Sequence, residues 1–286
     1  MNRWRMAGVC FLSLLLVVFW VGIRGFRPEA ELEGELVITA FAVGKADALL
    51  VQTEEQVIVV DTGEEEDGPY LVQELRNRGI RQVDLLLVTH FDKDHVGGAA
   101  YLMDHMEVAA VRIPDYEGDR PEYQAFLERL QGHPDVERLT DIYQYHAGDL
   151  ECTVYPAEDP KEIQNTDEEY DNDMSLVASL TFQDKRFLFT GDIEKTRIAQ
   201  MLTSDVDWQH DWIKMPHHGR YQKALKDLLE AVQPENAVIC CSEEEYAEKK
   251  TLQLLKEQGV RVWDTSKGCV TTVYRQGEIQ VKALLK

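Results

Sequence analysis

Apolar positions along this chain first form short strand-like runs and then alternate between strand and helix patterns. We predict strands at Leu36–Val43, Ala48–Thr53, Gln56–Val60, Val83–Thr89, Val108–Ile113, Leu150–Tyr155, Ser175–Phe182, Arg186–Phe189, Trp212–Met215, Ala237–Cys240, Cys269–Tyr274 and Glu278–Val281. We predict helices at Pro69–Arg78, Val96–His105, Pro121–Leu130, Glu194–Leu202, Lys223–Val232 and Tyr246–Gln258. This order predicts an α/β domain in which two sheets lie between helices, with functional loops at the strand ends.

The first part of the chain has a different pattern. Met6–Ile23 is an 18-residue run without a charge, and arginines flank it on both sides. Because a bilayer core needs about 20 apolar residues, we expect residues 1–28 to form one transmembrane helix that anchors the chain in the membrane. A cleaved signal peptide is the alternative, since a basic start and an apolar run also suit one.

The predicted organisation is therefore an anchor at 1–28, a linker at 29–34 and one folded domain at 35–286. Arginines on both sides orient the anchor only weakly. We expect a single-pass protein of the cell membrane with its domain outside the cytoplasm.

Charge limits the partners of this domain. The first 28 residues hold four of the 30 basic residues and none of the 52 acidic ones, so the remainder has a net charge of −26. Such a body repels nucleic acid at long range, which disfavours DNA as a partner. The five cysteines show no Cys-x-x-Cys spacing and favour thiols in the core, with a disulfide left open.

Four potential metal ligands follow directly after the apolar strand that ends at Thr89: His90, Asp92, Asp94 and His95. Side chains two apart in extended backbone point the same way, so His90 and Asp92 can hold one ion. Asp94 and His95 lie at the turn into a helix and can face a second ion. A loop whose charges only cap the helix would explain one Asp but neither His. Imidazole and carboxylate are ligands of hydrolytic divalent metals, so we predict one or two ions.

Two other predicted strands end at similar side chains. Arg186–Phe189 leads to Asp192, a natural bridging carboxylate, and Trp212–Met215 leads to His217 and His218. Alone, Asp192 fits a helix cap, and the histidines fit a surface loop. Three strands that each deliver a ligand at the carboxyl end predict a convergent metal site.

These residues belong to a series of motifs. They are Val-Gly-x-x-Asp-Ala (43–48), Asp-Thr-Gly (61–63), Thr-His-x-Asp-x-Asp-His-x-Gly-Gly (89–98), Asn-Asp-x-Ser-Leu (172–176), Thr-Gly-Asp (190–192) and His-His-Gly (217–219). The series resembles the metallo-β-lactamase superfamily, and in particular the lactamase-like domain of ComEC-type DNA-uptake proteins, from about residue 35 to the C-terminus. The resemblance implies a four-layer αββα sandwich. It implies metal ligands at His90, Asp92, Asp94, His95, Asp192 and His217, with Asp61 orienting a ligating histidine.

The chain departs from the family's pattern in several places. The family's usual third histidine on the first ion is replaced by a region that offers Asn172 and Asp173. An oxygen-rich ligand set favours harder ions, so Mn²⁺ stands beside Zn²⁺ as the expected metal. His-His-Gly-Ser of related domains becomes His-His-Gly-Arg220, which changes the substrate-facing rim.

We expect a hydrolase in which a metal-bound water ionises to hydroxide near neutral pH. Asp94 would ligate an ion and orient that hydroxide, and His218 is the candidate proton donor. Basic side chains in or beside the motifs favour a positive rim and a phosphodiester substrate: Lys45, Lys93, Lys214, Arg220 and Lys223. Lysines are also common at loop ends, so an ordinary solvated surface is an equal alternative for them.

Other functions stay open at this point. Hydrolysis of a small ester, lactone, thioester or amide needs no basic channel and suits the acidic body. A non-catalytic binding domain would explain the missing histidine, although the preserved motif at 89–98 and Asp192 disfavour it. An aspartic-protease interpretation of Asp61-Thr-Gly needs a second such carboxylate, and the chain has one copy of the triplet.

Overall fold

The computed structural model describes residues 35–166 and 170–284 of the chain. The predicted anchor at 1–28 and linker at 29–34 lie outside the described residues. Within the described ranges, no helix is both long enough and apolar enough to cross a membrane.

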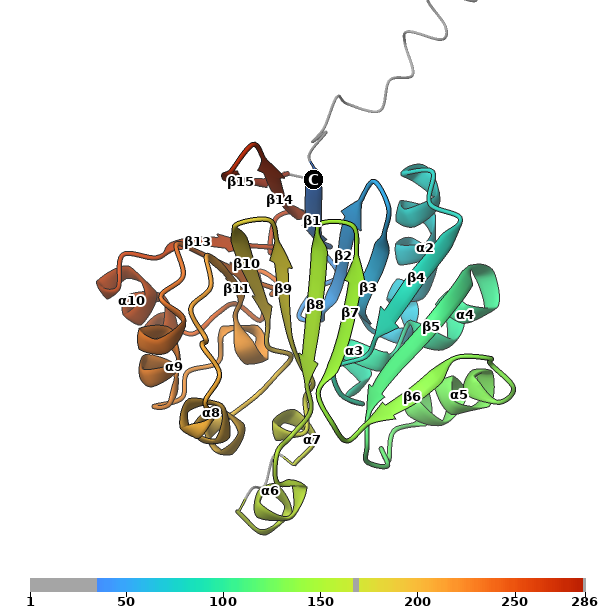
Figure 1. The fold of residues 1–286 in the computed structure, drawn as a ribbon, viewed down its shortest axis with the longest axis horizontal. Helices are drawn as coiled ribbons and strands as arrows, with labels where there is room; N and C mark the ends of the chain where they lie inside the picture. The colour runs from blue at the N-terminus through green and yellow to red at the C-terminus, as the bar shows by residue number, and fades with distance from the viewer. Residues whose placement is uncertain (1–34, 167–169, 285–286) are drawn as a thin grey trace, which may run out of the picture. The chain divides into compact units, whose positions relative to one another are not determined.

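Two mixed sheets form the centre of the domain (Figure 1). The eight-stranded sheet has the order β15-β14-β1-β2-β3-β4-β5-β6, and the seven-stranded sheet has the order β13-β12-β11-β10-β9-β8-β7. The first contains β1 (Leu36–Ala40), β2 (Ala48–Thr53), β3 (Val57–Thr62), β4 (Gln82–Leu87), β5 (Glu107–Pro114), β6 (Val136–Leu139), β14 (Val270–Arg275) and β15 (Glu278–Ala283). The second contains β7 (Tyr143–Ala147), β8 (Leu150–Tyr155), β9 (Val177–Phe182), β10 (Lys185–Phe189), β11 (Trp212–Lys214), β12 (Asn236–Ile239) and β13 (Arg261–Asp264).

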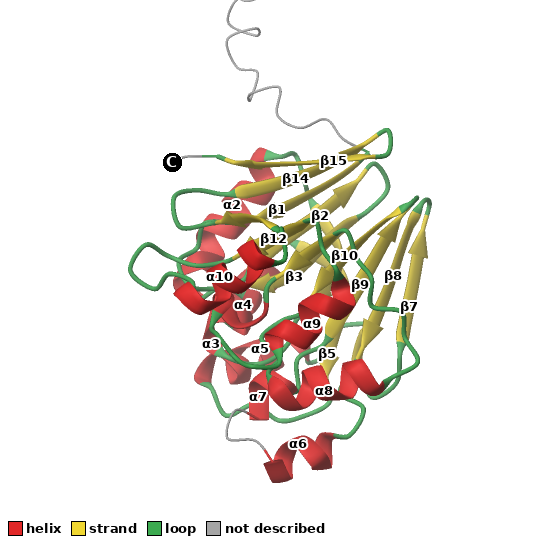
Figure 2. Cartoon of the chain, turned by 90° about the vertical axis from the view of Figure 1, so that its left-hand side faces the viewer, coloured by secondary structure: helices red, strands yellow, loops and turns green. Residues whose placement is uncertain are grey.

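Helices cover the outer face of each sheet (Figures 1 and 2). The first sheet is covered by α2 (Gly68–Asn77), α3 (Lys93–Val96), α4 (Ala99–His105) and α5 (Pro121–Leu130). The second is covered by α8 (Lys195–Thr203), α9 (Leu225–Val232) and α10 (Lys249–Glu257). Shorter elements are α6 (Pro160–Thr166), α7 (Tyr170–Asp173) and the 3₁₀ turns η1 (Glu65–Asp67) and η2 (Pro216–Gly219).

Alternating side chains on the buried strands separate these layers. In β4, Leu85 and Leu87 lie in the apolar layer between the two sheets, whereas Leu86 lies in the layer beneath α2, α4 and α5. A third apolar layer joins the second sheet to α8, α9 and α10. All four cysteines of the described residues are free thiols, three of them buried. The domain therefore has the αββα arrangement that the resemblance implied.

The predicted helix at Val96–His105 is confirmed as α4 from Ala99 onward but starts too early, because Val96 ends α3 and two glycines separate the helices. A Cβ atom on Gly97 would lie 2.5 Å from the backbone nitrogen of Glu65, and one on Gly98 would lie 2.4 Å from the carbonyl oxygen of Thr62. The connection after β3 therefore packs directly against the backbone at the break, where only glycine leaves room.

Three strands that the sequence pattern missed, β6, β7 and β13, are edge strands of their sheets. Along β7 the residues alternate between half-buried and exposed, and β13 has no fully buried residue. An edge strand is covered on fewer sides than a central one, so its apolar pattern is weaker. The short helices α6 and α7 were missed as well.

Candidate metal centre

Four strands deliver polar side chains to one end of the sandwich. Strands β3 and β4 run parallel in the first sheet, and β10 and β11 run parallel in the second. Asp61 lies near the end of β3, His90 follows β4, Asp192 follows β10 and His218 follows β11. Residues far apart in the sequence therefore meet where the carboxyl ends of both parallel pairs come together.

The carboxylate of Asp192 lies at the middle of this cluster. Its Oδ2 atom lies 3.3 Å from Nε2 of His95 and 3.2 Å from Nε2 of His218. The same His218 nitrogen lies 3.4 Å from Oδ2 of Asp94. Ligand atoms of Asp94, His95 and His218 all lie within 4.8 Å of one another. Two imidazoles and two carboxylates thus surround one point.

His90 forms a second group beside the first. Ligand atoms of His90, His95 and Asp192 lie within 4.8 Å of one another. Asp92, the predicted partner of His90, is less firmly placed, because its Oδ2 atom lies 3.8 Å from Nε2 of His90 and its side chain is 27% exposed. The other oxygen of Asp92 lies 3.5 Å from Arg120. Fewer ligands therefore converge at His90 than at His218.

The imidazoles are oriented so that their Nε2 atoms stay unused. Nδ1 of His95 donates to Oδ2 of Asp61 at 2.8 Å, and Nδ1 of His218 donates to the carbonyl oxygen of Cys240 at 3.0 Å. The Nε2 atoms of His90, His95 and His218 are buried without a hydrogen-bond partner. Such an atom costs about 1–3 kcal/mol, whereas a divalent ion accepts imidazole lone pairs held in this way. The residues present fit a metal ion.

Asp61 supports the cluster from the first sheet. Its Oδ1 atom accepts the backbone N–H of Thr89 at 2.7 Å, and its Oδ2 atom accepts the Thr89 hydroxyl at 2.7 Å as well as His95. Asp61 itself adopts left-handed backbone with φ of 56°, which Asp tolerates better than most residues. The structure therefore gives Asp61 the contacts of a residue that orients His95.

Burial and neighbouring charge set the pKa of each imidazole. Burial, reinforced by His95, lowers the pKa of His90 to about 4. Burial also disfavours charge on His218, but Asp192 and other carboxylates raise its pKa to about 9. Burial lowers the pKa of His95 as well, but Asp192, Asp61 and Asp47 outweigh it and raise this pKa well above its ordinary value. His90 is thus neutral, whereas a proton competes with any ion for the imidazole of His95 and for that of His218.

Backbone conformation separates the two adjacent histidines. His217 and His218 both adopt left-handed backbone, with φ of 46° and 50°, which costs roughly 1–3 kcal/mol per non-glycine residue. The turn buries His218 in the cluster, whereas Nδ1 of His217 lies 2.8 Å from Oε1 of Glu194. His217 belongs to no group of three converging ligand atoms among the described residues. The structure thus brings His218, rather than the predicted His217, to the ligand position.

Asn172 and Asp173, predicted near the first ion, are the last residues of α7, and the carboxylate of Asp173 contacts the start of α8 instead. Oδ1 of Asp173 accepts the backbone N–H of Glu194 at 2.5 Å, and Oδ2 accepts that of Thr196 at 3.2 Å. These amides belong to the first turn of α8, which has no intrahelical acceptor for them. Asp173 therefore caps α8, with Asn172 buried beside it.

We expect Asp173→Ala to lower the free energy of unfolding by about 1–2 kcal/mol because the first turn of α8 loses its acceptor. The metal content should stay at the wild-type level. Thermal unfolding and elemental analysis of the same preparation check both statements. A lower metal content in Asp173→Ala than in the wild type would show that this carboxylate binds an ion.

Two charged residues of the centre were missed as site residues by sequence reasoning. Asp47 and Lys214 are each 1% exposed and form an ion pair. The prediction of Lys214 on an exposed basic rim is wrong. Burial opposes its charge, but Asp47 and Asp192 raise the pKa of Lys214 well above its ordinary value. The motif at 43–48 was the available signal for Asp47, and no pattern indicated the burial of Lys214.

Cations around the mouth of the cluster mostly pair with carboxylates. The pairs are Lys93 with Glu64 at 2.7 Å, Arg220 with Glu194 at 3.5 Å and Arg120 with Asp92 at 3.5 Å. Lys45 is half-buried and Lys223 exposed. Arg120 was missed in the sequence because no motif contains it. The predicted rim therefore carries little unbalanced positive charge.

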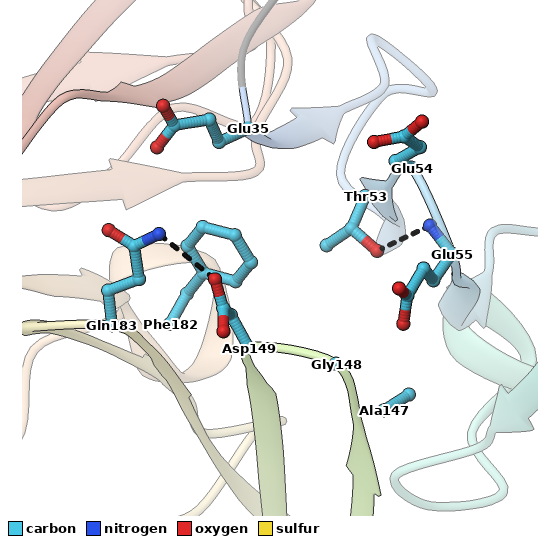
Figure 3. Close-up of a pocket in the computed structure, with 9 residues that line it drawn as sticks. All are labelled: Glu35, Thr53, Glu54, Glu55, Ala147, Gly148, Asp149, Phe182 and Gln183. Atoms are coloured by element: carbon cyan, nitrogen blue, oxygen red, sulfur yellow. Dashed lines mark hydrogen bonds between the residues drawn. The ribbon is translucent and has the colours of Figure 1, made fainter.

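A cavity of about 360 Å³ lies at the opposite end of the sandwich, among the connections that precede β3 and β10 (Figure 3). Its lining is acidic, with Glu35, Glu54, Glu55 and Asp149, and Gln183 donates to Asp149 at 3.1 Å. In the part of the chain that the structure describes, no imidazole or thiol lines it. The cavity is separate from the metal centre.

Comparison with known proteins identifies relatives of this chain. A family model described as the metallo-beta-lactamase superfamily matches residues 42–243. ComE operon protein 3 of Bacillus subtilis is 26% identical over 282 residues, which cover 90% of this chain and 34% of the relative. Competence protein ComA of Neisseria gonorrhoeae is 28% identical over 246 residues, which cover 80% of this chain and 32% of the relative. The chain thus spans about a third of the length of the curated relatives it matches.

Solved structures share the fold at low sequence identity. CmlA, a diiron β-hydroxylase from Streptomyces venezuelae, superposes with a TM-score of 0.53 at 14% identity, covering 88% of this chain and 54% of that protein. Similarity at this level supports the fold and leaves the chemistry to the residues of the site.

Proposed function

The chain belongs to the metallo-beta-lactamase superfamily, and from this premise we propose that it is a metal-dependent hydrolase. The observation that carries the proposal is the set of three buried imidazole Nε2 atoms without hydrogen-bond partners around Asp192. One divalent centre satisfies such nitrogens together with the adjacent carboxylates.

One ion would be bound tightly by Asp94, His95, His218 and Asp192. Two imidazole nitrogens and two carboxylate oxygens are donors that suit Zn²⁺, and a water molecule would be a further donor in a catalytic site. Mn²⁺ is the alternative, since half of the donors are oxygen. Asp61 and the Cys240 carbonyl hold the two rings in the orientation that binding requires.

A second ion would bind more weakly at His90. Asp192 is shared with the first position, and Asp92 is partly exposed and lies beside Arg120. The third histidine that the family usually provides has no counterpart there. Asp173, the predicted replacement, caps α8 instead. We therefore expect about one tightly held ion per chain, with a second at high metal concentration.

When bound, a divalent ion lowers the pKa of a coordinated water and polarises the bond to be cleaved. The side chain of Asp94 is 20% exposed, whereas those of His95, His218 and Asp192 are at most 4% exposed. Burial favours the neutral acid, but His218 and His95 hold the pKa of Asp94 far below its ordinary value. Asp94 is thus a carboxylate at the solvent side, placed to accept a hydrogen bond from the attacking water and orient it.

A phosphodiester is the substrate class that we propose. Support comes from the ComEC-like motifs and from the similarity to ComE operon protein 3 and competence protein ComA. Arg120 and Lys93 stand beside the metal centre and can contact an anionic substrate. Because the chain spans about a third of those relatives, the activity of the whole relatives is not implied for it.

Hydrolysis of a small ester, lactone, thioester or amide is the second candidate. The observation that favours it is the pairing of Lys93, Arg220 and Arg120 with carboxylates, which leaves little free positive charge at the mouth. The whole chain has a net charge of −22, which repels polyanions.

We also propose that Met6–Ile23 tethers the hydrolase to the cell membrane with its domain outside the cytoplasm. The support is the charge-free run of 18 residues between arginines. Protease accessibility of the domain in intact cells tests this orientation.

Metal analysis and turnover of the full-length chain test the hydrolase. We expect about one Zn²⁺ per chain and metal-dependent cleavage of bis-p-nitrophenyl phosphate, with both lost in Asp94→Ala. Cleavage of ester or lactam reporters alone would support the second candidate. A loaded chain that cleaves none of them is a binding domain, and a chain that retains no ion contradicts the proposal.

A further inference from the structure

A lysine side chain lies fully buried inside the metal centre. Lys214, the last residue of β11, is 1% exposed. Its ammonium group pairs with Oδ2 of Asp47, lies 3.2 Å from Oδ1 of Asp192 and donates to the carbonyl oxygen of Gly191 at 3.0 Å. An ammonium group has three N–H donors, and three acceptors meet it here.

These contacts join the two halves of the sandwich at its mouth. Asp47 immediately precedes β2 of the first sheet, whereas Asp192 follows β10 and Lys214 ends β11 in the second. The side chain of Lys214 therefore connects loops that belong to different sheets. Loss of this contact would remove one of the polar links between the two sets of metal ligands.

Lys214 also orients the carboxylate group of Asp192. The ammonium group lies against Oδ1, and Oδ2 lies 3.3 Å from Nε2 of His95 and 3.2 Å from Nε2 of His218. Because the ammonium group holds one carboxylate oxygen, the other oxygen is kept directed at the two imidazoles.

Negative charge is concentrated at this point, with four carboxylates close together: Asp47, Asp61, Asp94 and Asp192. A divalent ion would join the ligands of the two sheets only while it is bound, whereas the ammonium group is part of the chain. We propose that Lys214 is a positioning residue of the metal centre, a resident cation that holds Asp47 and Asp192 together and keeps the centre assembled without a divalent ion. This inference rests on the proposed ion site.

An ordinary structural ion pair would stabilise the protein equally with and without metal. A resident cation matters more in the metal-free state, because a bound ion would itself join Asp94 and His95 of the first sheet to Asp192 and His218 of the second. The dependence of stability on metal therefore distinguishes the two roles.

The experiment measures thermal unfolding of the full-length chain in a mild detergent, once in EDTA and once in saturating Zn²⁺. In EDTA, Lys214→Met should lower the melting temperature by on the order of 10 °C, and Zn²⁺ should recover at least half of the loss. The matched control is Arg197→Met, which removes another buried cation, bonded to the carbonyls of Tyr155 and Pro156. The decrease in melting temperature of Arg197→Met should be the same in EDTA and in Zn²⁺.

A double variant separates charge from packing. Asp47→Asn/Lys214→Met should melt several degrees above Lys214→Met in EDTA, because it removes the carboxylate left without its partner. Equal losses of Lys214→Met in EDTA and Zn²⁺, or a double variant no more stable than the single one, would overturn the proposal. If Lys214→Met does not fold in either condition, recovery of folding in the double variant supports the proposal and its absence contradicts it. If Zn²⁺ does not change the melting temperature of the wild-type chain, the proposed ion site is contradicted. The comparison of Lys214→Met with the double variant in EDTA still tests the role of Lys214, because it needs no ion.

Discussion

Replacing His218 with alanine is expected to weaken the binding of the tightly held ion by more than about 100-fold, because mutation of residues that merely orient a ligand already costs about 10–100-fold. Hydrolytic turnover at limiting metal should fall with it. His217→Ala is expected to keep the wild-type ion content, since its imidazole faces Glu194 rather than the other ligands. Neighbouring residues of the same type thus differ sharply in effect.

The two variants form a matched pair. Both positions have left-handed backbone with nearly the same φ, so alanine meets similar backbone strain at each. Chelator competition with Zn²⁺ measures the ion affinity, and circular dichroism confirms that each variant is folded. Equal losses in the two variants, or a larger loss in His217→Ala, would refute the ligand assignment.

The layers of the fold could be predicted because their signals are local. A central strand such as β4 is apolar on both faces, so its run of leucines stands out in the sequence. The outermost strands β6, β7 and β13 bury less and gave no such signal. The break between α3 and α4 depends on backbone contacts with Thr62 and Glu65, which lie about thirty residues earlier in the chain.

The residue types of the ligand cluster could be predicted from the sequence, but not which residue takes each ligand position. His90, Asp94, His95 and Asp192 follow strand ends, and the parallel pairing of those strands brings them together. Which histidine of an adjacent pair faces inward depends on two left-handed residues in one turn, and such a turn has no sequence signature without glycine.

Lys214 and Asp173 show the same limit for charged residues. A lysine after an apolar strand and an aspartate in an acidic run both have the pattern of surface positions. Burial of Lys214 follows from its pairing with Asp47, and the capping role of Asp173 follows from its position beside α8. Both depend on contacts between segments far apart in the sequence.

Metal binding is expected to tighten by about 100-fold per pH unit between about pH 6 and pH 8, because one ion displaces two protons. In the metal-free protein the pKa of His218 is raised to about 9 and that of His95 lies well above its ordinary value. Both imidazoles are therefore positively charged near neutral pH, with a proton on each ring nitrogen. His90, with a pKa lowered to about 4, contributes none. The dependence should weaken above about pH 9, once His218 has lost its proton in the free protein.

Calorimetric titration of Mn²⁺ in two buffers with different ionisation enthalpies counts the protons released, with about two expected near pH 7. Asp61→Asn should reduce the number of protons released, because His95 then loses a carboxylate 2.8 Å from its Nδ1 atom.

The raised pKa of His218 has the opposite consequence for the stability of the metal-free protein, which should fall as the pH rises. His218 contributes stability fully below its ordinary pKa of 6.5 and loses that contribution as the pH rises through about 9. An ion affinity that does not change with pH would show that the imidazoles are already neutral, and that the carboxylates around them do not retain protons in the free site.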